Sequence, residues 1–378
     1  MLKNKIYKYF FKEILKNFIT ILLTFTTIAW VVKAVNFLDL MVEDGYGSSI
    51  YFKYSILNIT TIITKFIPLS FLLSLTVSII KFERQKEFLI LWTSGLPKIK
   101  IVNIFLVISL IITFLQLVLA LFLNPFLLNK SRYLLSNTQD LQINTVLKTN
   151  DFSDTFKGIT FFIDNKKDNN ELENIFIKDS TGALNIVVDE LNNKKNSTII
   201  AEKGFISDDD KLILFDGMIQ TLNDKNQIKN IFFKKTELSL SGISTRTIKQ
   251  PKIQETSTKI LLNCALGLVE SLNLKNCSKS YKNESIQNLS RRSGAPLYIP
   301  LITIVTSFLL INKKEKIYNF FRRYIFFIFS FVLLLFAEVA LKYTGLSRIV
   351  GISYFAVPII ISFFFYILLI RKIINKKK

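Results

Sequence analysis

The residues best suited to a specific interaction lie in a short mixed-charge segment, 81–97, between two long apolar runs. The segment opens with lysine, glutamate and arginine, continues through Glu87 into the apolar run 88–92, and stops at Gly95 with Pro97 beyond. Glycine just past a helix and proline soon after it are helix stop signals. We therefore expect an amphipathic helix at about 81–97 that presents the Glu87 carboxylate. Such a helix either lies on anionic lipid or docks into a groove of a protein partner, and the residue types alone do not distinguish these two interpretations.

Cationic side chains in or beside apolar runs form a second candidate site. Lys33 and Lys65 each interrupt an apolar run, and the pair Arg291 and Arg292 precedes another. A lysine within a membrane span is costly and often marks a pathway, although its long stem also lets the amine reach the interface. A lipid that carries phosphates needs cationic contacts, so these four residues are lipid-binding candidates. The alternatives are snorkelling for the lysines and ordinary headgroup contact for the arginines.

The composition excludes several classes of active site. The chain has no histidine, which removes Ser-His-Asp and Cys-His catalysis and histidine-ligated metals. Its two cysteines, Cys264 and Cys277, cannot make a zinc site, and one disulfide or two buried thiols are equally open. No G-x-x-x-x-G-K-[ST] sequence occurs, so ATP-driven work would need a separate ATPase. We expect no metal and no cofactor.

Six apolar runs are long enough to cross a bilayer, which takes about 20 mostly apolar residues. They are predicted at 18–35, 55–80, 101–123, 296–311, 324–341 and 352–370. The net charge of +21 could suggest nucleic acid, but the lysines cluster beside these runs. We therefore assign the charge to membrane flanks and expect no nucleic-acid partner.

The basic residues of the short loops predict the orientation, because such loops stay in the cytoplasm. Four basic segments fall on one side when the crossings are counted: the N-terminal segment, 81–100, 313–323 and 371–378. The loop after the first span is acidic instead, with Asp39, Glu43 and Asp44. Both termini are thus predicted to be cytoplasmic, and the polar middle of the chain lies on the opposite side. No cleavage site follows the first span, which we expect to be retained.

The middle of the chain, from about 150 to 240, changes to short alternating segments broken by Gly, Asn and Asp turns. Many short strands of this kind are typical of a sandwich or jelly roll. Strands are predicted at 158–164, 174–178, 184–188, 197–201, 211–215, 218–222 and 228–234. The fold class is therefore a membrane α-helical bundle of six helices, three and three, around an inserted all-β jelly-roll-like domain. The predicted domains are 1–125, 126–290 and 291–378.

Three features together resemble one known family. The string Glu87-Phe-Leu-Ile-Leu-Trp-Thr-Ser-Gly95-Leu is similar to the cytoplasmic "S-E-x-x-x-x-x-x-x-G" motif of the lipopolysaccharide-export permeases, the LptF/LptG family. The run Ile67-Pro-Leu-Ser-Phe-Leu-Leu73 resembles that family's "L-P-L-S" segment. The three-helix, β-domain, three-helix layout covers almost the whole chain. The family also has such residues at the positions of Arg291-Arg292 and Leu341-Lys342. The chain departs from the family motif at Lys86, where the residue before the glutamate is usually small and polar.

The resemblance implies a function and a set of partners. It implies a permease subunit of an ATP-driven ABC exporter that extracts lipopolysaccharide from the inner membrane and passes it to a periplasmic bridge. The partners would be a paralogous permease in a heterodimer, a dimeric cytoplasmic ATPase that contacts Glu87 in the helix ended by Gly95, and a periplasmic jelly-roll protein. The lysine in the first span resembles the F-type. The chain would be a multi-pass protein of the bacterial inner membrane with a periplasmic central domain.

Two alternatives come from other classes. One is a mechanotransmitting ABC permease, although such permeases usually have four spans. The other is a membrane-anchored envelope enzyme with an extracytoplasmic β domain, for which the acidic run 208–210 offers carboxylates. That run falls in a predicted turn between strands, where a solvated loop is the simpler explanation.

Overall fold

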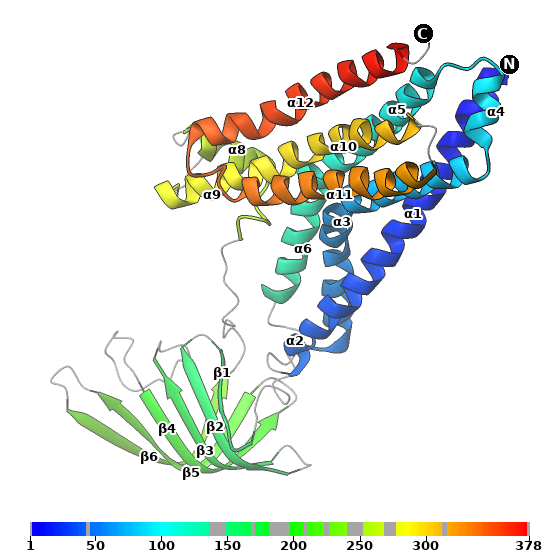
Figure 1. The fold of residues 1–378 in the computed structure, drawn as a ribbon. Helices are drawn as coiled ribbons and strands as arrows, with labels where there is room; N and C mark the ends of the chain where they lie inside the picture. Colours follow the sequence, from blue (N-terminus) through cyan, green and yellow to red (C-terminus); the bar gives the residue numbers. More distant parts are fainter. Residues whose placement is uncertain are drawn as a thin grey trace. The chain divides into compact units, whose positions relative to one another are not determined.

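The chain folds into long helices and one antiparallel sheet, seen here in a computed structural model (Figure 1). The structure describes residues 2–42, 46–136, 149–156, 158–167, 171–180, 197–207, 211–222, 227–239, 252–267, 277–311 and 316–375. The predicted strand 184–188, the acidic run 208–210 and the terminal lysines fall outside the described residues. The chain divides into two compact units. The first unit consists of Met1–Val31, Asn58–Asn129 and Pro251–Lys378, and the second consists of Val32–Leu57 and Lys130–Gln250.

Within the described residues, six helical segments are long and apolar enough to span a membrane, which confirms the six predicted spans. They cover Lys5–Met41, Ser48–Arg84, Lys98–Leu135, Lys279–Leu310, Tyr324–Leu341 and Ile349–Ile374. The helices in the first half are α1 Leu2–Asn36, α2 Asp39–Val42, α3 Ser48–Arg84, α4 Glu87–Thr93, α5 Lys98–Val118, the π-helical turn η1 Leu119–Leu123 and α6 Asn124–Ser136. Those after the sheet are α8 Thr258–Leu266, α9 Lys279–Leu289, the π-helical turn η4 Ser290–Gly294, η5 Ala295–Leu297, α10 Tyr298–Ser307, η6 Phe308–Leu310, α11 Lys316–Leu341 and α12 Arg348–Asn375.

Helix α10 is the centre of the helical unit. All but one of its residues are buried, and it contacts α5, α11 and α12. Helices α1 and α3 are joined by polar bonds as well as by aromatic packing. Ser74 Oγ donates to the Ile14 carbonyl at 2.9 Å, Asn17 Nδ2 donates to Ser78 Oγ at 2.9 Å, and Lys81 pairs with Glu13. Small hydroxyl side chains let two helices approach closely in an apolar medium.

The described part of the insertion forms a six-stranded antiparallel sheet in the order β1-β2-β3-β4-β5-β6, which confirms the all-β insertion between helices. Its strands are β1 Phe152–Phe156, β2 Ile159–Lys166, β3 Glu171–Asp179, β4 Ser197–Ser207, β5 Lys211–Leu222 and β6 Ile228–Ser239. The described strands follow one another as a meander, and the finer jelly-roll description stays a prediction. One face forms a core of isoleucine and leucine side chains.

The two strands predicted at 211–215 and 218–222 are a single strand, β5. The sequence Asp216-Gly217 looks like a turn, and Asp216 does have a φ of +48°. The register is nevertheless the same on both sides, because Phe215 pairs with Lys235 and Gly217 with Phe233. A Cβ atom at Gly217 would lie 2.4 Å from the Ile200 carbonyl oxygen, so only glycine fits at this point of the strand.

Candidate functional site

Helix α4 presents the Glu87 carboxylate beside the first turns of α1. Glu87 is the first residue of α4 and is half-buried. Tyr9 Oη on α1 donates a hydrogen bond of 2.9 Å to Glu87 Oε1. One carboxylate oxygen is thus held by the chain itself, and an ionised carboxylate has capacity for further donors. Sequence reasoning found Glu87 but missed Tyr9, because the two lie 78 residues apart.

An aromatic cluster fixes this short helix. Seven residues are too few for a helix to be stable in isolation, so its position must come from packing. Phe88 is 3% exposed, and its ring centroid lies 6.0 Å from Phe10, 5.6 Å from Phe82 and 5.8 Å from Trp92. Lys98 Nζ covers the Trp92 ring at 4.0 Å from its centroid. Phe88 therefore joins α4 to α1 and to the end of α3.

Both ends of α4 use left-handed backbone. Lys86 precedes the helix with a φ of +58°, and Gly95 follows it with a φ of +84°. At the C-terminal end the Leu96 amide donates to the Leu91 carbonyl at 3.0 Å, and the Gly95 amide donates to the Trp92 carbonyl at 3.2 Å. This pair of bonds is a Schellman motif, which requires a left-handed residue and favours glycine.

The solvent side of α4 combines exposed apolar side chains with the Glu87 carboxylate. Leu89 is 55% exposed and Ile90 is 63% exposed. A groove of about 340 Å³ between α1 and α4 is lined by residues that include Lys5, Glu87 and Ile90. Exposed apolar residues around a placed charge are characteristic of a docking surface.

The lysine candidates lie apart from this helix. Lys33 is half-exposed in the last turn of α1. Lys65 is exposed on α3, three residues before Pro68, which lies inside that continuous helix. Both positions are sterically accessible to a lipid headgroup.

The two neighbouring arginines have different surroundings. Arg291 is half-buried, whereas Arg292 is 6% exposed. Arg292 Nη2 donates to the carbonyl oxygens of Ile253 at 3.3 Å, Gln254 at 3.0 Å and Thr256 at 3.0 Å. Its Nη1 donates to Thr258 Oγ1 at 2.9 Å. The guanidinium is thus directed at the chain's own oxygens and away from a surface, which gives Arg292 a structural role.

Thr258 extends this network to the π-helical turn η1. Its hydroxyl donates to the Leu121 carbonyl oxygen at 2.5 Å. Arg292 lies in the second π-helical turn, η4, and η1 and η4 are in contact. A π-helical turn displaces the regular hydrogen bonds and leaves carbonyl groups for side chains to bind. Hydropathy carries no signal for such a turn.

The two cysteines are brought together in this region. The structure joins Cys264 of α8 to Cys277 before α9 through their sulfur atoms, with Cα atoms 6.0 Å apart. Among the described residues, no group of three His, Cys, Asp or Glu side chains could hold a metal ion.

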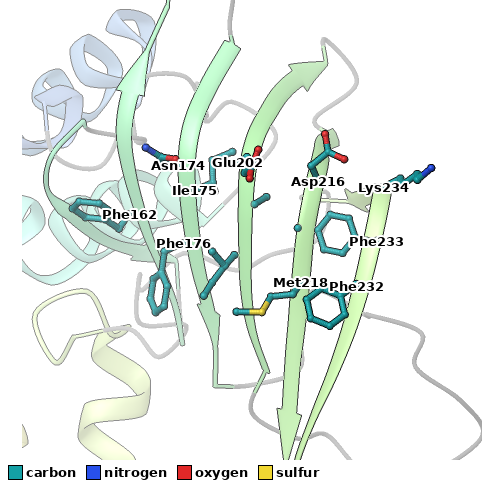
Figure 2. A pocket seen from close by; sticks show the side chains of 13 residues that line it. Phe162, Asn174, Ile175, Phe176, Glu202, Asp216, Met218, Phe232, Phe233 and Lys234 are labelled. Atoms are coloured by element: carbon teal, nitrogen blue, oxygen red, sulfur yellow. The ribbon is translucent and has the colours of Figure 1, made fainter.

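The sheet carries a groove of about 680 Å³. Figure 2 shows aromatic side chains in this groove, which include Phe162 of β2, Phe176 of β3 and Phe232 of β6. Polar side chains border them, among them Asn174 and Asp216. The groove is mostly apolar with a polar margin, which suits a lipid chain better than a polar ligand.

The register explains the groove. Six residues pair directly from strand to strand and form what we term the apolar row: Phe152, Phe162, Phe176, Ile200, Met218 and Phe232. Phe232 is 78% exposed, and Phe152 is 63% exposed. The row lies on the face opposite the buried core, because core residues stand on both sides of the row residue in β2, β3 and β4, and Ile219 follows Met218 in β5. Only the register of the strands brings these six residues into one row.

Two comparisons with known proteins bear on these features. The chain is 25% identical over 178 residues to the uncharacterized protein RP871 of Rickettsia prowazekii (strain Madrid E). This similarity covers 47% of the chain and 49% of that relative, so the match spans about half of the relative's length. The family model "Lipopolysaccharide export system permease LptF/LptG" matches residues 8–372. Since this match includes nearly the whole chain, the protein belongs to the LptF/LptG family of lipopolysaccharide export system permeases.

Proposed function

We propose that the chain is a permease subunit of an ATP-driven exporter that extracts lipopolysaccharide from the bacterial inner membrane. Family membership supports the substrate class. The absence of a Walker A sequence supports a separate ATPase as the energy source. The proposed partners are a paralogous permease, a dimeric cytoplasmic ATPase and a periplasmic bridge protein. The loop charges support cytoplasmic termini and a periplasmic sheet.

The observation that carries the proposal is the α4 surface. Glu87 lies in the first turn of a helix whose outer side exposes Leu89 and Ile90. Because Phe88 packs this helix against α1 and α3, a displacement of α4 would also displace these two spanning helices. In this mechanism the ATPase binds α4, and nucleotide binding and hydrolysis in the ATPase shift the cytoplasmic ends of α1 and α3.

Co-purification tests the coupling role directly. The detergent-solubilised chain is compared with Glu87→Ala and with Glu83→Ala, the same change at a carboxylate of the preceding helix. We expect the wild type and Glu83→Ala to recover an ATPase and a second six-span permease, and Glu87→Ala to lose the ATPase. Recovery of the same ATPase with Glu87→Ala would remove the coupling role. Recovery of the chain alone in every case, with retained turnover of an envelope substrate, would favour an enzyme.

We also propose that the apolar row contacts the acyl chains of the transported lipid. Five strand spacings of about 4.8 Å give the row a length of about 24 Å, which suits an extended acyl chain. A photoreactive phenylalanine analogue at Phe232 should crosslink lipopolysaccharide in cells. The control is the same analogue at Asn230, which lies on the same face of β6 in a polar row with Gln220. Equal crosslinking at both positions would contradict the role of the row.

A further inference from the structure

A crevice of about 520 Å³ lies between the N-terminal turns of α1 and α5. Its floor is apolar and is formed by Phe11 of α1 with Ile104, Val107 and Ile108 of α5. Val107 is 55% exposed, so the floor continues onto the outer surface of the helices. An apolar floor of this kind, at the end of a spanning helix, is accessible to the first methylene groups of a lipid chain.

The remaining lining residues are hydrogen-bond donors. Lys8 and Lys100 bring two amines, and within the described part of the chain neither forms an ion pair. Tyr7 adds a hydroxyl group. Asn103 Oδ1 already accepts a bond of 3.0 Å from Tyr366 Oη, which leaves the Asn103 amide group to donate. Among the described residues that line the crevice, none carries a carboxylate.

These properties together define the ligand. Two ammonium groups and two neutral donors, without a competing carboxylate, match a phosphodiester anion. A soluble phosphate would make no contact with the apolar floor, and an uncharged lipid would leave both amines without an anionic partner. The ligand must therefore be anionic at one end and apolar at the other.

The orientation that the loop charges predict places the crevice at the cytoplasmic ends of α1 and α5. The N-terminal end of α1 contacts α4, which belongs to the basic segment 81–100. Basic pockets between helices on the cytoplasmic side of a membrane bind anionic headgroups. We propose that this crevice is a binding site for an anionic phospholipid of the cytoplasmic leaflet. The site uses none of the residues that we propose for contact with the transported lipid.

Photolabelling of the purified full-length chain tests the proposal. The probes are phosphatidylglycerol and phosphatidylcholine with the same photoreactive acyl chain, each at the same mole fraction in mixed micelles. We expect phosphatidylglycerol to label the peptides that carry Phe11 and Val107 about tenfold more strongly, because each nearby cation favours an anionic headgroup. High salt should weaken this preference.

Charge variants supply the matched control. Lys8→Gln with Lys100→Gln should reduce phosphatidylglycerol labelling to the phosphatidylcholine level. Lys12→Gln with Lys16→Gln removes the same charge from exposed positions of α1 outside the crevice and should leave the labelling unchanged. A monodisperse gel-filtration peak for each variant shows that it is folded. Equal labelling by the two lipids, or loss of labelling when the partner permease is present, would overturn the proposal.

Discussion

Replacement of Arg292 by lysine separates a structural from a lipid-binding role. The arginine makes four hydrogen bonds, to three backbone carbonyl groups and to Thr258. Lysine has three donors on one nitrogen atom and cannot reproduce the planar fork of a guanidinium. We expect Arg292→Lys to lose at least two of these bonds. Since a hydrogen bond to a charged group contributes about 1.5–3 kcal/mol, the segment 252–258 should be destabilised by about 3 kcal/mol or more.

Amide hydrogen exchange of the full-length chain measures this loss. The Glu255 and Thr256 amides are bonded to the Lys252 carbonyl at 2.8 and 3.2 Å and report on the segment. A change of about 3 kcal/mol corresponds to an increase of about 100-fold in their exchange rate, at 1.4 kcal/mol for each factor of ten. The neighbouring Arg291→Lys is the matched control and should leave both rates unchanged.

The opposite pattern would refute the structural role. If Arg292→Lys left the exchange of the segment unchanged but reduced crosslinking to lipopolysaccharide, the guanidinium would act on lipid as the basic pair first suggested. If both arginine variants raised exchange equally, the four hydrogen bonds would not be the source of the protection.

Three further predictions concern residues around α4 and α8. Gly95→Val should destabilise the C-terminal cap of α4 by about 1–2 kcal/mol, because a β-branched side chain disfavours left-handed backbone. Gly95→Asn should be tolerated, and ATPase co-purification at increasing salt distinguishes the two variants. Tyr9→Phe removes one hydrogen bond to Glu87 and should weaken ATPase binding about fivefold, or by about 1 kcal/mol, without abolishing it. An unchanged affinity for the ATPase in a titration would argue against a positioning role for Tyr9. Cys264 and Cys277 should resist thiol alkylation until a reductant is added, and immediate labelling of both by maleimide would show that they are reduced.

The spanning helices were predictable because their signal is local. Each apolar run is long enough to be recognised without knowing its neighbours, and the glycine and proline after residue 93 mark the end of α4. The β insertion was predictable for the same reason, from its period of two. Among the described residues the strands differ from the prediction in two places. Strand β1 Phe152–Phe156 was not predicted, and a turn was predicted at Asp216-Gly217, which lies inside a continuous strand because the neighbouring backbone approaches too closely for a side chain.

The features that the sequence did not predict depend on contacts between distant residues. The bond between Tyr9 and Glu87 and the apolar row both require knowledge of which elements pair. Arg292 is the clearest example, because a basic pair before an apolar run has the same appearance whether it faces lipid or the carbonyl groups of residues 253–256. Burial decides between these roles, and burial is set by tertiary structure.

The packing of Phe88 explains how a seven-residue helix could transmit motion to the membrane. Helix α4 has too few residues to hold its own shape, so any displacement that keeps it folded must keep Phe88 against its neighbours. Those neighbours include Phe10 on α1 and Phe82 on α3, which are 1% and 0% exposed and cannot move independently of their helices. The Lys81–Glu13 pair and the Ser74 hydrogen bond then tie α1 to α3 further along. A partner that moves α4 would consequently displace both helices as a pair. Rotation of either helix alone would open a cavity around a buried phenylalanine. The cost would be about 3–5 kcal/mol if the ring lost its packing entirely.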